Sequence, residues 1–256
     1  MASRDELDEH FDGTELDHQV WFPYYLPHWS SRERSAAGYA VRDGALHLSI
    51  PIDQGLWCAD RHEEPLRVSC LQTGSFAGPL GSTVGQQPFR DGLTVLEEQP
   101  TFWGYTPCYG QVEVRMRAVI SARSMVALWM SGLEDRPERC GEICVVEIFG
   151  DTVGDAQADV GVGIKAFRDP RLVQEFTAEP LPIDVTAFHT YAVDWNPGSL
   201  TFSVDGQEVR RLGQAPDYPV QLMLGVFDFP TKAVDPLTDR LVPELVVSHV
   251  RGRPAP

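Results

Sequence analysis

The stretch Gly141-Glu142-Ile143-Cys144-Val145-Val146-Glu147-Ile148-Phe149 sets two carboxylates five residues apart in an otherwise apolar run. Its β-branched and aromatic residues favour a strand, and the leading glycine is typical of a turn before it. An unpaired carboxylate inside an apolar strand costs several kcal/mol or is neutralised by a shifted pKa. Two of them in one strand therefore indicate a water-filled cleft that crosses the face of the strand.

The spacing of five residues creates a problem of parity. Side chains alternate along a regular strand, so Glu142 and Glu147 would point to opposite faces. A single β-bulge at Val145-Val146 adds one residue and restores a common face, which Cys144 would share. The alternative is an edge strand with one solvated glutamate on each face, and the segment alone does not choose between the two. In the bulged form, the two carboxylates are the minimum needed to hydrolyse a glycosidic bond.

Length and composition favour a single domain of residues 1–256. The chain is 43% hydrophobic, which is enough for a large core. Its formal net charge of −16 disfavours nucleic acid and anionic membrane surfaces as partners. No apolar segment approaches the roughly 20 residues that span a bilayer. We expect residues 1–10 and 253–256 to be frayed.

The start of the chain is acidic and lacks the basic and apolar regions of a signal peptide. This pattern leaves two compartments open, the cytoplasm or, for a trimmed sequence, the extracellular space. The five cysteines match no zinc-binding spacing. Disulfides between Cys58 and Cys70 and between Cys108 and Cys140 are compatible with the sequence, and buried free thiols are the alternative.

Strand signals dominate the rest of the chain, and no long segment has helical periodicity. The expected strands are 44–50, 68–73, 111–120, 125–131, 143–149, 188–195, 200–204, 220–227 and 245–251. Three segments rich in Gly, Pro or small acidic residues are expected to be long loops, namely 74–92, 151–159 and 230–243. This pattern predicts an all-β fold, an antiparallel β-sandwich with glycine- and proline-marked turns.

Six segments then occur in a recognisable order. They are His10-Phe11-Asp12-Gly13-Thr14-Glu15-Leu16-Asp17 with Trp21, Tyr109-Gly110-Gln111-Val112-Glu113-Val114-Arg115, Ala127-Leu128-Trp129-Met130, the stretch from Glu142 to Glu147, Phe188-His189-Thr190-Tyr191-Ala192-Val193-Asp194-Trp195 with Phe202-Ser203-Val204-Asp205-Gly206, and Val246-Val247-Ser248-His249-Val250-Arg251. Together they resemble glycoside hydrolase family 16, the laminarinase and lichenase group. The resemblance implies a concanavalin A-like jelly roll, and the catalytic strand is similar to the longer, bulged form found in that family.

The resemblance also implies a role for each residue of the opening stretch. Glu142 would be the nucleophile and Glu147 the general acid/base of a retaining double displacement. Mutual repulsion of the two carboxylates would help to keep Glu147 protonated. Cys144 stands where the family has an Asp, and a thiol beside two carboxylates should stay neutral. Losing that Asp should weaken the repulsion and loosen the orientation of Glu142.

Aromatic residues and one histidine complete the expected site. By resemblance, Trp129 would form an aromatic floor under the sugar, and His189 would lie on a strand next to the catalytic one and reach Glu147 or a sugar hydroxyl. Trp103 and Tyr105 could reach the rim of the cleft. Each of these residues has an ordinary structural alternative, as a core aromatic or a satisfied histidine. Trp57 is a further candidate for a loop over the cleft, and Trp195 is expected in the core.

No cofactor and no metal are expected. The family often carries a structural calcium on its convex side, but here His10 and Ser248 occupy the places of its acidic ligands, and calcium prefers oxygen donors. The predicted function is hydrolysis of a β-linked polysaccharide, with a β-1,3- or mixed-linkage glucan favoured and a galactan as the other candidate. Transglycosylation, a lectin-like protein with an impaired site and a structural protein-binding sandwich are the alternatives.

Overall fold

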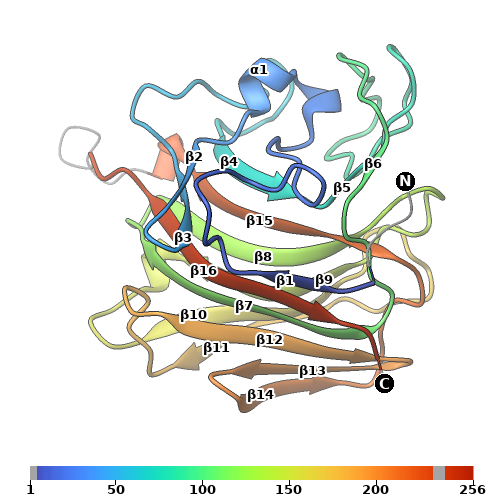
Figure 1. Ribbon diagram of the computed structural model, residues 1–256. Coiled ribbons are helices and arrows are strands. Elements are labelled where there is room, and N and C mark those ends of the chain that lie inside the picture. The colour runs from blue at the N-terminus through green and yellow to red at the C-terminus, as the bar shows by residue number, and fades with distance from the viewer. Residues whose placement is uncertain (1–4, 233–239, 256) are drawn as a thin grey trace.

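The computed structural model describes residues 5–232 and 240–255, which form an antiparallel β-sandwich (Figure 1). Within this part of the chain one sheet has eight strands, in the order β14-β13-β12-β7-β16-β3-β2 with β1 also paired to β16. The bounds are β14 Gln207–Leu212, β13 Ser199–Val204, β12 His189–Asn196, β7 Gly110–Val119, β16 Glu244–Arg253, β3 Ala45–Ser49, β2 Tyr39–Arg42 and β1 Leu7–Glu9.

The second sheet of the described chain has six strands, in the order β11-β10-β9-β8-β15-β4. The bounds are β11 Glu175–Leu181, β10 Ala158–Lys165, β9 Glu142–Phe149, β8 Ser124–Gly132, β15 Val220–Asp228 and β4 Arg67–Gln72. A small ribbon pairs β5 Gly74–Ser75 with β6 Phe102–Trp103. Helical turns are short: η1 Pro27–Trp29, α1 Arg32–Ser35, η2 Gly150–Thr152 and η3 Pro230–Lys232.

The main core lies between the two sheets and follows from strand alternation. Along β7, Val112, Val114 and Met116 are buried, whereas the residues between them are partly or fully exposed. This period of two is typical of a strand with one face toward the core and one toward solvent. The eight-stranded sheet therefore keeps a solvated outer face.

The six-stranded sheet differs because both of its faces are covered. Every residue of β8 is buried. Val126 and Leu128 belong to the core between the sheets, whereas Ala127 and Trp129 belong to a second cluster on the outer face. Residues of the loops before β2 and between β3 and β7 complete this second cluster, and Figure 1 shows these loops with α1, β5 and β6 on one side of the sandwich. The outer face of this sheet is thus roofed in part by loops.

The antiparallel sandwich predicted from the sequence is confirmed, and each of the nine expected strands is present with ends shifted by one or two residues. Seven strands were not predicted, namely β1, β2, β5, β6, β10, β11 and β14. The expectation of a frayed start is wrong for β1, which pairs with β16 and buries Leu7. Residues 1–4 and 256, and residues 233–239 of the loop expected at 230–243, lie outside the described residues.

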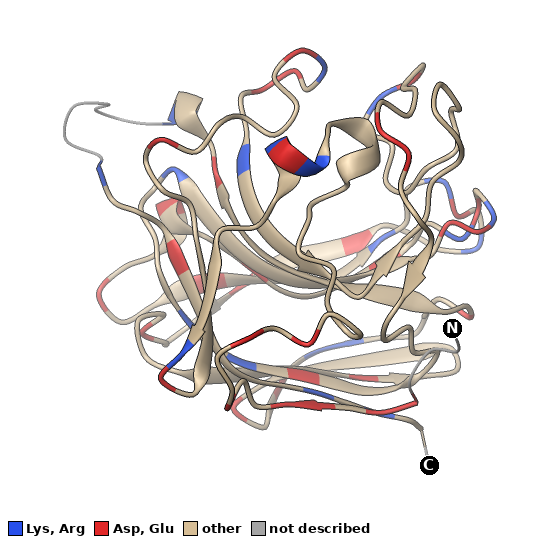
Figure 2. Cartoon of the chain, turned by 45° about the horizontal axis from the view of Figure 1, so that its top comes forward, with Lys and Arg blue, Asp and Glu red and all other residues tan. Residues whose placement is uncertain are grey.

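All five cysteines are free thiols, so neither disulfide forms; the alternative of buried free thiols is confirmed for four of them, whereas Cys108 is exposed. Acidic and basic residues are interspersed along loops and strands in the view of Figure 2. Among the described residues, no helix has the length and apolar character needed to cross a membrane.

Candidate active site

A β-bulge in β9 brings the two glutamates to one face. On β8, Leu128 lies opposite Val146 and the next residue, Trp129, lies opposite Cys144, so Val145 has no partner in the register. The pairing of β9 with β10 is irregular at the same place. The extra residue turns both valines toward the core between the sheets. The bulge predicted from parity is confirmed.

Glycine in β10 makes room for this irregularity. Gly163 lies opposite Cys144 and has a φ of +137°, a conformation that residues with a Cβ rarely adopt. A Cβ at this position would also collide with the carbonyl oxygen of Glu175 on β11. Gly161 lies opposite Glu147, and a Cβ there would press against Phe176 and the Cβ of Glu147. The glycines therefore let β10 and β11 follow the bulged strand closely.

Glu142 and Glu147 both line a cleft of about 420 Å³ on the outer face of the six-stranded sheet. Most of its wall is apolar, with a few polar groups, as is usual for sites that bind small molecules and sugars. The aromatic residues that line it are Tyr25, Trp57, Phe89, Trp129, Phe149, Phe167, Phe227 and Phe229. Such faces can stack against the C–H patches of sugar rings.

Glu142 lies deep in this cleft, with 5% of its surface exposed. Burial raises its pKa from 4.5 to about 8, and the negative charges of Glu147 and Glu134 add to the rise. The ammonium of Lys165 and a hydrogen bond with the Trp129 side chain oppose it. At neutral pH the resting site therefore holds a proton on Glu142.

Glu147 is held by an ion pair that the sequence did not predict. Its Oε1 lies 2.5 Å from Nζ of Lys165, the last residue of β10. The ammonium also lies 4.8 Å from the centre of the Phe176 ring, a cation–π contact that fixes it from the other side. A sugar oxygen can hydrogen-bond to Glu147 only by competing with the ammonium of Lys165.

Cys144 lies between the two glutamates on the same face and is completely buried. Burial raises the pKa of its thiol well above the ordinary value, and the carboxylates of Glu147 and Glu142 raise it further. The expectation of a neutral thiol agrees with this. Sequence reasoning did not anticipate that the pKa of Glu142 is raised, with its deep burial as the first cause.

A second ion pair, between a buried glutamate and a partly exposed arginine, lines the cleft. Glu134, in the turn between β8 and β9, contacts Arg168 at 2.5 Å and accepts a hydrogen bond from the backbone N–H of Gln87 at 2.6 Å. Burial raises the pKa of Glu134 to about 7 against the effect of these partners. Three loops that are distant in the sequence meet at this carboxylate. It therefore fixes the rim of the cleft.

The remaining expected site residues divide into two groups. Trp129 and Trp57 line the cleft, as proposed for each, and Trp195 is buried in the main core as expected. Tyr105 also lies in the main core, completely buried, so its placement at the rim was wrong. Trp103 lies on β6, where its ring stacks on Phe76 and not along the described cleft lining.

His189 was expected on a strand next to the catalytic one, and this was wrong. It begins β12, which pairs with β7 and β13 in the other sheet. Its Nδ1 lies 2.7 Å from Asp205 Oδ2, and its Nε2 lies 3.1 Å from the carbonyl oxygen of Asp184. The order of strands along the chain is not their order in the sheets, so sequence proximity misplaced this histidine.

Sequence reasoning missed Lys165, Glu134 and Arg168. Lys165 lies on β10, which was not predicted as a strand because three of its neighbours in 158–165 are small. A usable signal was present in Val160-Gly161-Val162-Gly163-Ile164-Lys165, where β-branched residues alternate with small ones and end in a charge.

Comparison with known proteins now adds to this geometry. The sequence model described as "Glycosyl hydrolases family 16" matches residues 105–234, just over half of the chain and the part that carries β7 to β15. A beta-glucanase of Fibrobacter succinogenes is 30% identical over 146 residues, which are 56% of this chain and 39% of the relative. The chain thus spans well under half of this curated relative.

Two solved structures show the same sandwich. A GlcNAcα1-4Gal-releasing endo-β-galactosidase from Clostridium perfringens superposes with a TM-score of 0.79 at 25% identity, covering 96% of this chain and 61% of that one. The catalytic domain of an endo-1,3-β-glucanase (laminarinase) from Thermotoga petrophila gives a TM-score of 0.65 at 16% identity, covering 96% and 95%. The second likeness concerns the fold alone.

Proposed function

Because the chain belongs to the glycosyl hydrolases of family 16, we propose that it cleaves internal bonds of a β-linked glycan with retention of configuration. The observation that carries this proposal is the bulge at Val145, which sets Glu142 and Glu147 on one face of an aromatic-lined cleft. Two carboxyl groups about 5–5.5 Å apart that flank the scissile glycosidic bond are the requirement of the retaining mechanism.

In the proposed reaction, the carboxylate of Glu142 attacks the anomeric carbon and forms a covalent glycosyl-enzyme. The proton that rests on Glu142 passes to Glu147 as the glycan binds, and Glu147 gives it to the departing sugar oxygen. Glu147 then removes a proton from the water that releases the product. The positive charge that develops on the sugar favours the ionised form of Glu142. This counteracts the burial that raises its pKa to about 8 in the resting site. Because the two glutamates share a single proton and Glu147 needs it as general acid, activity is expected to fall as the pH rises past about 8.

Two substrate classes have separate support. Similarity to a beta-glucanase favours a β-glucan, as proposed from the sequence. The likeness to an endo-β-galactosidase extends over 96% of the chain and favours a β-linked galactose-containing glycan. A panel of laminarin, lichenan and β-galactans, with product sizes followed over time, distinguishes the two. Added acceptor oligosaccharides that give longer products would instead indicate transglycosylation.

The decisive test is a Glu142→Gln variant with Glu98→Gln as a control, since Glu98 is exposed and does not line the cleft. We expect Glu142→Gln to abolish hydrolysis and to prevent labelling by a 2-fluoro glycoside that traps the glycosyl-enzyme. Glu147→Gln should lose roughly 10²- to 10⁴-fold. If Glu142→Gln hydrolyses as fast as wild type, the mechanism is wrong. A wild type that binds glycan but neither cleaves it nor is labelled is a lectin.

A further inference from the structure

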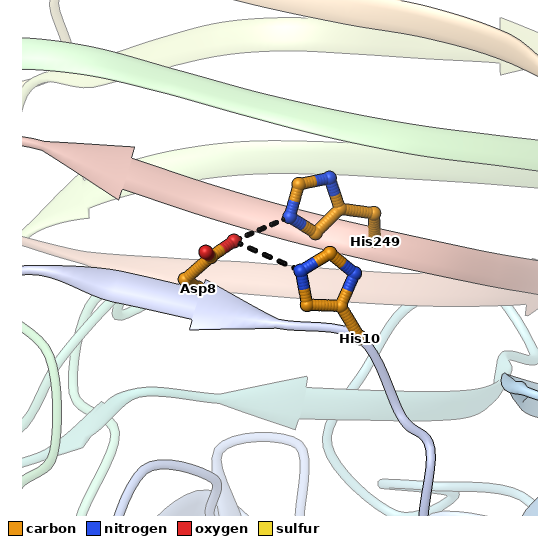
Figure 3. A group of neighbouring side chains, drawn as sticks. All are labelled: Asp8, His10 and His249. Atoms are coloured by element: carbon orange, nitrogen blue, oxygen red, sulfur yellow. Dashed lines mark hydrogen bonds and ion pairs between the residues drawn. The ribbon is translucent and has the colours of Figure 1, made fainter.

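The pairing of the first and last strands gathers three metal-binding side chains on the face opposite the cleft. In the register of β1 with β16, Asp8 lies opposite Arg251. Side chains two residues apart share a face of a sheet, so His10 and His249 fall on the same side as Asp8. Figure 3 shows the three side chains converging above the outer surface of the eight-stranded sheet.

The contacts within this group are close. Oδ1 of Asp8 lies 2.6 Å from Nε2 of His249 and 3.3 Å from Nε2 of His10. The two imidazole rings stack with centroids 4.1 Å apart and planes at 10°. The three potential ligand atoms all lie within 4.8 Å of one another. One carboxylate oxygen and two imidazole nitrogens thus lie close together, and one ring has to turn out of the stack before both nitrogens can bind the same ion.

Calcium does not fit this group. The family resemblance implied a calcium on this side, with His10 and Ser248 in place of acidic ligands. The hydroxyl of Ser248 accepts a hydrogen bond from the guanidinium of Arg115 at 2.9 Å, so a cation already faces it. Calcium requires six to eight oxygen ligands, and here one carboxylate stands beside two nitrogens. The donor set instead suits a borderline transition-metal ion.

We propose that Asp8, His10 and His249 form a binding site for a divalent transition-metal ion of the zinc type, which links β1 to β16. Zinc binds imidazole nitrogen and carboxylate oxygen at about 2.0–2.2 Å, so tetrahedral ligands lie roughly 3.3–3.5 Å apart. The separation of Asp8 and His10 already has this value, and His249 needs to withdraw from Asp8 by less than 1 Å as the ion replaces the shared proton.

The surroundings leave room for an ion and for an open coordination shell. A carboxylate oxygen of Asp8 lies within 3.3 Å of one nitrogen of each imidazole. Arg251, two residues from His249 on β16, is already paired with Glu113 at 2.6 Å. The side chains of Asp8 and His10 are 62% and 54% exposed, so water can complete the coordination of the ion.

A bound ion would fasten the short strand β1 to β16. β1 has three residues and precedes Phe11, which is buried in the main core. An ion shared between His249 on β16 and two residues at the start of the chain would hold this segment against the sheet. The site lies on a different sheet from the cleft, so its effect should be on stability and not on turnover.

The test is calorimetric titration of the chelator-treated, untagged protein with ZnCl2 and, separately, CaCl2. The starting protein carries Cys108→Ser, because Cys108 is an exposed thiol that could itself bind zinc. We expect one zinc ion per chain, a higher melting temperature with zinc, and no effect of calcium. His10→Ala and His249→Ala should each weaken binding by roughly 10- to 100-fold. The exposed His18→Ala is the matched control and should bind as the starting protein does.

Cobalt(II) gives an independent readout, because a tetrahedral or five-coordinate site with two imidazoles absorbs visible light. Asp8→Asn, which keeps the size of the side chain, should lose this absorption even if an alanine variant proves unstable. The proposal is overturned if the starting protein binds no zinc at millimolar concentration. It is equally overturned if both histidine variants bind zinc as tightly as His18→Ala does.

Discussion

Replacing Glu142 by glutamine is expected to stabilise the protein while it abolishes the proposed activity. The reason is the cost of an ionised carboxyl group at this buried position. Its pKa is about 8 in the folded protein and 4.5 when the group is free in water. Glutamine has nearly the same shape and an oxygen that can accept from the Trp129 side chain, but it carries no charge.

The sign follows from linkage between folding and protonation. A carboxyl group with a raised pKa binds its proton more tightly in the folded state, so its favourable effect is complete below pH 4.5 and is lost as the pH rises to about 8. Each pKa unit corresponds to about 1.36 kcal/mol, so the loss is about 5 kcal/mol between these limits. In a chain of this length, a loss of about 5 kcal/mol lowers the melting temperature by about 10 °C.

The assay is the melting temperature of wild type, Glu142→Gln and the exposed control Glu98→Gln, measured in one buffer series from pH 4 to pH 9. The advantage of Glu142→Gln over wild type should grow between pH 4.5 and 8 and then become constant. Glu98→Gln should follow wild type throughout. Glu147→Gln should have the opposite effect, a loss of about 1–3 kcal/mol, because it leaves the ammonium of Lys165 without its partner.

Two results would refute this reasoning. The first is a Glu142→Gln variant that melts at or below the temperature of wild type at pH 9. The second is a difference between the two proteins that does not change with pH. Either would mean that Glu142 is ionised at little cost in the resting site, and that burial does not control its protonation.

Four further substitutions test neighbouring parts of the site. Lys165→Met removes the cation that lowers the pKa of Glu142, so the alkaline fall of kcat/KM should move to higher pH. Trp129→Phe keeps an aromatic face but loses the indole N–H, and kcat/KM should fall by roughly tenfold, the worth of one hydrogen bond. Gly163→Ala should lower stability by about 2–3 kcal/mol in urea unfolding, because of its positive φ and the collision with β11. Cys144→Asp should lower both stability and rate, since it adds a buried negative charge. A faster and equally stable variant would show that the cysteine impairs catalysis.

The bulge could be predicted because strand parity is a local property. Two glutamates five residues apart reach one face only if an extra residue intervenes, and Val145 is that residue. Parity limited the choice to a bulge or an edge strand, and the resemblance to a family with a bulged catalytic strand favoured the bulge. The place of Trp129 in the cleft was likewise implied by the resemblance, and Trp129 lines the cleft.

The positions of Lys165 and His189 could not be predicted from the periodicity of a single strand. The position of Lys165 beside Glu147 depends on the pairing of β10 with a bulged strand, which is a register between segments 18 residues apart. His189 was misplaced because β12 crosses to the other sheet, and nothing in its own sequence records that crossing. Tyr105 was misplaced because an aromatic residue in a loop suits a cleft rim as well as a core.

Lys165 and Cys144 together give a physical reason for the departure from the family pattern. A third acidic residue between two buried glutamates would leave a single ammonium to balance the whole row. With a neutral thiol at this position and a proton on Glu142, the buried row holds one carboxylate, that of Glu147, against the one ammonium of Lys165. Burial favours such a compensated pair over any unbalanced arrangement. The neutral thiol therefore suits a site in which one lysine balances one carboxylate. In Cys144→Asp the ammonium of Lys165 would have to balance two carboxylates, which is why we expect a slower enzyme.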